Sequence, residues 1–205
     1  MKKDIYIIGA GGVGSETVQL IKDINKVNYT WNLCGFLDEN QSLKGNLICD
    51  VEVIGFINEL KLKYKKNDEI NFVCSVSNPR VKKILIDKLI LAFPNAVFPT
   101  LIHPTSKVFD YTSLGKGVII QANVIVSTNC VIGDYVQINP QCGIGHDCTI
   151  KDYSSLYWNV NLSGHVTIEK NVLMGSKSSV IQSKVIGEGS TVGMASLVLN
   201  DVGPG

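Results

Sequence analysis

The sequence lacks an excess of charge of either sign, and it lacks long apolar runs. Its 205 residues include 19 Lys and Arg against 18 Asp and Glu, which gives a formal net charge of +1. This balance argues against a large basic field for nucleic acid and against an acidic solvating tail. No stretch approaches the roughly 20 apolar residues of a membrane helix. We therefore expect neither nucleic acid nor a membrane as a partner.

The N-terminus has only a weak likeness to a secretory signal. Two lysines precede the apolar run Ile5–Ile8, but the run is short and a glycine cluster follows it at once. We interpret residues 4–8 as a first β-strand and expect a cytoplasmic protein.

An aliphatic residue recurs at every sixth position over almost half of the chain, without an insertion. This period fits neither an amphipathic helix nor a hairpin, and it predicts a parallel β-helix built from hexapeptide turns. The sixteen positions are Val108, Leu114, Ile120, Val126, Ile132, Ile138, Ile144, Ile150, Leu156, Leu162, Ile168, Met174, Val180, Ile186, Val192 and Val198.

The six cysteines include no C-x-x-C pair. Cys130, Cys142 and Cys148 each stand four places after an aliphatic residue of the repeat, where valines stand in other hexads. Both positions are therefore expected to face the interior. We interpret these cysteines as core residues of a cytosolic protein rather than as disulfides or metal ligands.

Residues 1–102 alternate strand and helix signals, which predicts a small parallel α/β sheet. A solenoid domain is expected from residue 103 to residue 205. The predicted strands of the first domain are 4–8, 31–37, 70–76 and 96–98, its predicted helices are 15–25, 58–64 and 80–93, and residues 54–55 are expected in a short loop.

Gly9, Gly11 and Gly14 form a G-x-G-x-x-G motif between the first strand and the first helix, and Asp38 ends the next strand. Small residues here let backbone N–H groups and a helix N-terminus approach a pyrophosphate, while an acidic side chain accepts from a hydroxyl or a ring N–H. The alternative is that the glycines only pack the strand against the helix. The motif alone suggests NAD, but a domain ending near residue 100 lacks a second mononucleotide half, so a sugar nucleotide fits better.

The chain has three histidines. His103 precedes Pro104 at the domain junction and is interpreted as structural. His146 and Asp147 are expected to face away from the apolar interior, where imidazole can act as a general base and the carboxylate can hold its tautomer. The alternative is that His146 is an exposed histidine with no catalytic function. His165 lies one residue beyond the position that is a full coil after His146. We interpret it as a second candidate base or as a contact to the cofactor.

The Gly-rich α/β region, the Leu-Ile-His-Pro junction at residues 101–104 and the Gly-His-Asp-Cys-Thr-Ile hexad at 145–150 together resemble one family. They resemble the sialic-acid O-acetyltransferases and bacillosamine-pathway sugar N-acetyltransferases, left-handed β-helix enzymes of the hexapeptide acyltransferase superfamily. The resemblance implies a homotrimer with three-sided coils, active sites between subunits, acetyl-CoA as co-substrate and no metal.

The resemblance also assigns roles to residues of this chain. It implies that His146 is the general base with Asp147 beside it, that Asn139 lies near the acceptor sugar, and that the Gly164 N–H faces the acetyl donor. Gly9, Gly11, Gly12 and Asp38 would hold the nucleotide. Ser155 stands where such enzymes often carry a second histidine, so the contacts near it to acetyl-CoA or the acceptor are left open. Gly203–Gly205 falls before their Gly-x-Pro-Ala segment, so no contact to the adenine is predicted.

These observations predict an N-acetyltransferase that acts on a nucleotide-linked 4-amino-4,6-dideoxy sugar in bacterial surface-glycan (O-antigen) biosynthesis. An O-acetyltransferase of sialic acid is the near alternative. A non-catalytic scaffold that binds sugar nucleotides is the alternative from another class. The residues leave open whether the nucleotide is UDP, dTDP or GDP.

Overall fold

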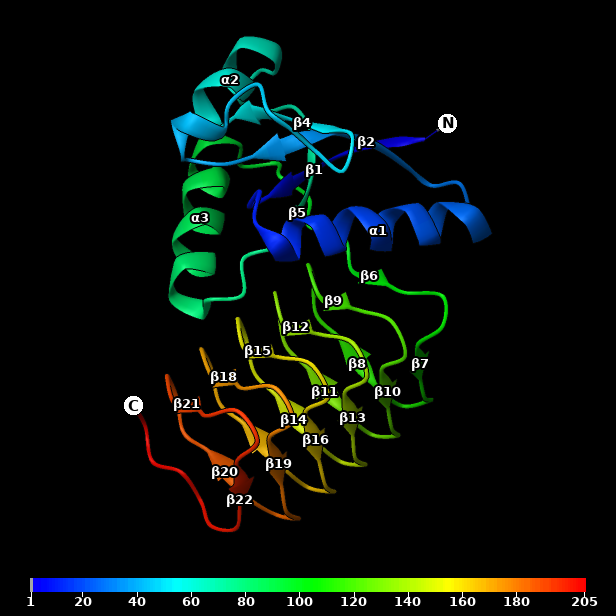
Figure 1. The fold of residues 1–205 in the computed structure, drawn as a ribbon, viewed down its shortest axis with the longest axis vertical. Coiled ribbons are helices and arrows are strands. Elements are labelled where there is room, and N and C mark those ends of the chain that lie inside the picture. The colour runs from blue at the N-terminus through cyan, green and yellow to red at the C-terminus, as the bar shows by residue number, and fades with distance from the viewer. Residues whose placement is uncertain (1) are drawn as a thin grey trace. The chain divides into compact units, whose positions relative to one another are not determined.

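The computed structural model of the protein describes residues 2–205, which divide into two compact units (Figure 1). The first unit contains the residues up to Ser77 together with Val81–Pro99. The second contains Asn78–Arg80 together with Thr100–Gly205.

The boundary between the units falls close to the expected one. Leu101 and Ile102 already pair with Ile119 and Ile120 as a strand of the second unit, so the division lies between residues 99 and 100 rather than after residue 102.

The first unit is an α/β sheet with three helices. In chain order its elements are β1 (Lys3–Ile8), α1 (Gly12–Val27), β2 (Trp31–Leu37), the 3₁₀ turn η1 (Gln41–Leu43), β3 (Leu47–Ile48), β4 (Val51–Gly55), α2 (Ile57–Lys63), β5 (Asn71–Cys74) and α3 (Pro79–Ala92). The sheet order is β3-β4-β2-β1-β5. All its pairs are parallel except β3 with β4, and α1 packs on β1 and β2. The predicted parallel α/β sheet is confirmed.

Two local predictions in this unit were wrong. Residues 54–55 are not in a loop but end β4, where Val53 is fully buried beside Phe36 of β2. Residues 96–98 do not form a strand, because only Val97 pairs, in an isolated bridge with Asn71.

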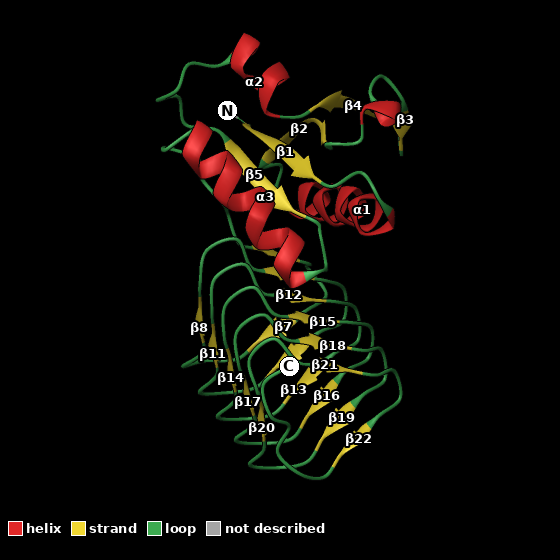
Figure 2. Ribbon diagram, turned by 90° about the vertical axis from the view of Figure 1, so that its left-hand side faces the viewer, coloured by secondary structure: helices red, strands yellow, loops and turns green. Residues whose placement is uncertain are grey.

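The second unit is the expected left-handed β-helix. Figure 2 shows its coils stacked along one axis, with short strands joined by turns. Its strands are β6 (Leu101–Ile102), β7 (Lys107–Val108), β8 (Ser113–Leu114), β9 (Ile119–Ile120), β10 (Ile125–Val126), β11 (Val131–Ile132), β12 (Gln137–Ile138), β13 (Gly143–Ile144), β14 (Thr149–Ile150), β15 (Ser155–Leu156), β16 (Asn161–Leu162), β17 (Thr167–Ile168), β18 (Leu173–Met174), β19 (Ser179–Val180), β20 (Val185–Ile186), β21 (Thr191–Val192) and β22 (Leu197–Val198).

Three successive hexads make one coil, and every strand pair between coils is parallel. Ile125 pairs with Gly143 and Gly143 with Asn161, for example. The strands form three faces: β6, β9, β12, β15, β18 and β21 in the first; β7, β10, β13, β16, β19 and β22 in the second; β8, β11, β14, β17 and β20 in the third. The sixteen aliphatic residues of the hexads are the second residues of β7 to β22, so the predicted register is confirmed.

The interior of the β-helix is one continuous apolar cluster. Cys130, Cys142 and Cys148 belong to it, and all three are free thiols. Each thiol donates to a backbone carbonyl further along the chain, as Cys148 does to Ser163 at 3.1 Å. The predicted core role of these cysteines is confirmed. None of the helices in residues 2–205 combines the length and apolar character that crossing a membrane requires.

Candidate active site

The candidate site lies at the corner between the second and third faces of the β-helix. At this corner the third turn residue has a left-handed backbone in successive coils: φ is 58° at Asn129, 57° at Asp147 and 60° at His165. Because one full coil separates each of these three residues from the next, they lie above one another in the stack. The second turn residues form a parallel column, in which His146 lies between Thr128 and Gly164.

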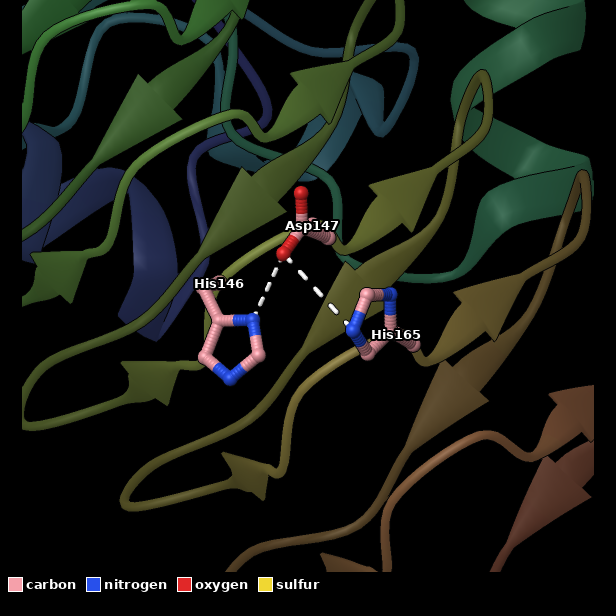
Figure 3. A group of neighbouring side chains, drawn as sticks. All are labelled: His146, Asp147 and His165. Carbon is pink, nitrogen blue, oxygen red and sulfur yellow. Dashed lines mark hydrogen bonds and ion pairs between the residues drawn. The ribbon is translucent and has the colours of Figure 1, made fainter.

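His146 and Asp147 form a hydrogen-bonded pair (Figure 3). The His146 Nδ1 lies 2.6 Å from Asp147 Oδ2, and both side chains are accessible, with exposed fractions of 52% and 35%. The hydrogen bond from His146 holds the pKa of Asp147 below its usual value, with further help from Asn129 and from the charge of His165. An ionised Asp147 fixes the imidazole proton on Nδ1 and leaves the Nε2 lone pair to accept a proton.

Asp147 has a partner in each neighbouring coil. Asn129 donates from Nδ2 to Asp147 Oδ1 at 3.3 Å, and His165 Nε2 lies 3.8 Å from Oδ2. The His165 ring stands edge-on to the His146 ring, with the centroids 5.1 Å apart. The sequence singled out His165 but missed Asn129, although its spacing of one full coil from Asp147 contains the signal.

Gly164 makes room for the imidazole of His146. A Cβ atom on Gly164 would lie 2.6 Å from both Cε1 and Nε2 of that ring. The backbone itself does not require glycine here, since Thr128 and Gln182 occupy the same turn position in other coils. Within residues 2–205 the Gly164 N–H donates no hydrogen bond. A base and a free backbone donor thus lie side by side, the arrangement that stabilises an oxyanion during acyl transfer.

Asn139 is not brought to this site within one chain. It follows β12, at the corner between the first and second faces, and only 3% of it is exposed. Its Oδ1 accepts a hydrogen bond from Gln137 Nε2 at 2.9 Å.

The glycines of the N-terminal motif divide into two kinds. Gly9 has φ +95°, and a Cβ on Gly14 would collide with the Gly9 carbonyl and lie 2.9 Å from the Phe36 ring. These two glycines are needed for the turn and for packing. A Cβ on Gly11 or Gly12 would meet no atom within 4 Å, and α1 begins here without a side-chain cap. The open N–H groups of this helix N-terminus suit an anion.

Asp38 lies in the wall of a cavity of about 210 Å³, together with Gly9 and the apolar side chains of Leu37, Phe56 and Val76. Its two carboxylate oxygens accept from the backbone N–H groups of Ala10 and Asn40, each at 2.9 Å. Asp38 therefore connects the glycine turn to the loop after β2. Gly11 and Gly12 are exposed and do not line this cavity.

The fold matches solved structures over almost the whole chain. PerB from Caulobacter crescentus, in complex with CoA and GDP-perosamine, has a TM-score of 0.86 at 21% identity, covering 98% of this chain and 91% of that one. The acetyltransferase domain of PglB from Neisseria gonorrhoeae, in complex with acetyl coenzyme A, also has a TM-score of 0.86, at 22% identity, with coverage of 99% and 94%. The architecture is thus that of the β-helical sugar acetyltransferases.

Sequence comparison defines the family. Residues 4–89 match the PglD N-terminal domain. GDP-perosamine N-acetyltransferase of Escherichia coli O157:H7 is 31% identical over 183 residues, which cover 86% of this chain and 77% of that protein. This chain belongs to the family of sugar N-acetyltransferases that includes this enzyme.

Proposed function

We propose that this chain transfers the acetyl group of acetyl-CoA to the amino group of a nucleotide-linked 4-amino-4,6-dideoxy sugar. The observation that carries the proposal is the pair formed by the His146 imidazole and the free N–H of Gly164. The family relationship to GDP-perosamine N-acetyltransferase supports an amine as the acceptor and GDP-perosamine as the first substrate to test.

The residues at the corner have complementary tasks. His146 Nε2 takes a proton from the sugar amine as the nitrogen forms a bond to the thioester carbonyl carbon. The Gly164 N–H donates to the oxygen that becomes negative, an interaction typically worth about 3–4 kcal/mol. The imidazolium of His146 then returns its proton to the thiolate as the C–S bond breaks. Asp147 stabilises the imidazolium in between, and His165 is placed to contact the acetyl donor.

The α/β unit would hold the nucleotide. The open N–H groups at Gly11 and Gly12 suit the pyrophosphate. Gly9 and Asp38 share a cavity wall at the carboxyl ends of β1 and β2, the edge at which parallel sheets bind ligands.

The working assembly in this proposal is a homotrimer with sites between subunits. Aliphatic side chains point outward from both faces that meet at His146: Ile125 and Leu197 are 49% and 63% exposed, and Val131 and Val185 are 51% and 41% exposed. Burial of such residues against copies of the chain would stabilise an assembly. A role for Asn139 in binding the acceptor also requires a second copy. We place this reaction in the cytoplasm, in surface-glycan (O-antigen) synthesis.

A thiol-release assay with acetyl-CoA tests the reaction. The acceptors are GDP-perosamine, UDP- and dTDP-linked 4-amino-4,6-dideoxy sugars, and free sialic acid. We expect release with a 4-amino nucleotide sugar and none with sialic acid. Release with sialic acid alone would identify an O-acetyltransferase, and no release with any acceptor would favour a scaffold.

A further inference from the structure

Figure 3 shows the rings of His146 and His165 both directed at the Asp147 carboxylate, so two imidazoles and one carboxylate lie together on the outside of the β-helix. One ligand atom from each residue lies within 4.8 Å of the others. The backbone fixes this group, because the His165 N–H donates to the His146 carbonyl at 2.9 Å. Contact with the acetyl donor would give His165 a task, but it does not require that the imidazole be directed at the carboxylate of the His146–Asp147 pair, 3.8 Å from Oδ2.

The donor set selects one class of ion. Imidazole nitrogens together with a carboxylate suit Zn²⁺ and its neighbours Co²⁺ and Ni²⁺, which bind such ligands at about 2.0–2.2 Å. Mg²⁺ and Ca²⁺ prefer oxygen ligands alone. The thiols of Cys130 and Cys148 do not compete, because both are buried in the apolar interior and donate to carbonyls there.

The three ligand atoms lie within 4.8 Å of one another, so small side-chain movements would form a three-ligand site. Ligands at about 2.0–2.2 Å around a tetrahedral ion lie roughly 3.3–3.6 Å apart. The 3.8 Å between His165 Nε2 and Asp147 Oδ2 is near this separation. The 2.6 Å between His146 Nδ1 and the same oxygen is shorter because a proton lies between them. A metal ion would replace that proton and move the two groups slightly apart.

We propose that these three side chains form a site for a Zn²⁺-class ion that switches off the His146 base. A metal ion on Nδ1 occupies its lone pair, so the one proton of the neutral ring moves to Nε2. Nε2 then no longer accepts a proton from the acceptor amine. The inhibitory part of this inference rests on the proposed acetyl transfer, whereas metal binding does not.

Metal binding is tested directly with Co²⁺ on the full chain, by titrating its visible absorption under reducing conditions. Wild type is expected to bind one Co²⁺ per chain, which excess Zn²⁺ displaces. His165→Gln should weaken binding about tenfold or more, since even lost outer-shell contacts cost roughly 10–100-fold. Gln141 occupies the same turn position in another corner with φ 63°, so the backbone tolerates this change. His103→Gln, outside the cluster, is the matched control and should bind as wild type does.

Unchanged Co²⁺ binding in both His165→Gln and Asp147→Asn would overturn the site.

The inhibitory role is tested by adding Zn²⁺ to the thiol-release assay, with each variant compared with its own metal-free rate. We expect Zn²⁺, but not Mg²⁺, to abolish turnover reversibly with EDTA, and His165→Gln to require about tenfold more Zn²⁺. Binding without loss of turnover would refute the inhibition. A wild type that binds Co²⁺ but releases no thiol without metal refutes the proposed function and leaves the site standing.

Discussion

At the scale of single residues, the absence of a side chain at Gly164 is as important as the presence of the imidazole at His146. A Cβ atom at residue 164 would lie 2.6 Å from the ring, and the backbone there accepts other residues. The requirement for glycine therefore comes from the ring that it faces. A serine or threonine here would displace the base.

Gly164→Ala is expected to lower kcat about 100-fold, because a shift of roughly 1 Å in a catalytic group costs that much. The free energy of unfolding should change little, since the imidazole is 52% exposed and can rotate into solvent. Gly193→Ala is the control: it adds the same methyl group in a turn where the nearest atom is 3.4 Å away. Equal kcat values for the two variants, measured by thiol release, would contradict this account.

Residue-scale prediction from the sequence depended on the repeat. The length of the coil indicated that His146 and Gly164 are neighbours, and the structure places the ring against that glycine. The same spacing places Asn129 next to Asp147 in the stack, but spacing alone does not show that the amide reaches the carboxylate. Side-chain rotamers decide such contacts, and a repeat pattern does not contain them.

At the scale of elements, two glycines of the turn between β1 and α1 have different roles: Gly14 is needed for packing, and Gly11 is open to a ligand. Gly14→Ala should lower the stability of the α/β unit by about 1–3 kcal/mol, because the added methyl group meets the Gly9 carbonyl and the Phe36 ring. Gly11→Ala adds a methyl group in open space and should leave stability nearly unchanged. If the turn binds pyrophosphate, Gly11→Ala should raise the KM for the nucleotide sugar about tenfold, or about 1.4 kcal/mol. Denaturant unfolding measures the change in stability, and steady-state kinetics measure the change in KM. An unchanged KM in Gly11→Ala would show that the glycine motif serves packing alone.

The start of α2 depends on the charge of Glu59. Its Oε2 accepts from the Phe56 N–H at 2.9 Å and its Oε1 pairs with Lys44 at 2.6 Å. These contacts, the Lys44 hydrogen bond first, lower the pKa of Glu59 from 4.5 to about 2. Because the folded-state pKa is the lower one, the stabilisation is complete above about pH 4.5 and is lost as the pH falls toward 2.

Glu59→Gln keeps an oxygen that can accept from the Phe56 N–H but removes the charge, so it should destabilise the protein at pH 7 by roughly 0.3–1 kcal/mol. The difference from wild type should shrink between pH 4.5 and pH 2. Urea unfolding at pH 7, 4 and 3 measures it, and Lys61→Gln, which removes an exposed charge from the same helix, is the control. A difference that stays constant with pH would show that the charge of Glu59 contributes nothing.

Most elements of the α/β unit were predictable, including the short α2, β1 and β5, which agree with their predicted spans to within two residues. The spans of α1, α3 and β2 agree with their apolar patterns to within a few residues. Strand β4 was missed because it is short and ends in Gly55, which is typical of a turn. It is a strand because Val53 is buried against β2, a tertiary contact that local sequence does not report.

At the scale of the whole molecule, the sequence predicted the register of the β-helix to the residue, because an uninterrupted hexad leaves a single register, but it placed the start of the β-helix three residues too late. Asn139 and His146 lie at different corners of one chain, and this became clear only when each turn was assigned to the two faces that it joins. If Asn139 serves the site, a second copy of the chain must supply it. Homotrimer formation is thus the whole-molecule prediction that matters for function.

Analytical ultracentrifugation is expected to give a mass three times the 22.3 kDa of one chain. Val131→Lys and Ile125→Lys, on the two faces that meet at His146, should lower that mass and the thiol-release rate together. A monomer with full activity would contradict shared sites.

The central claim is that the His146 imidazole is the base for acetyl transfer. The most direct measurement is kcat for thiol release by His146→Gln, because Gln182 already occupies this turn position two coils further along. The account predicts a fall of roughly 10²–10⁴-fold with the thermal midpoint unchanged. A kcat close to that of wild type would contradict it.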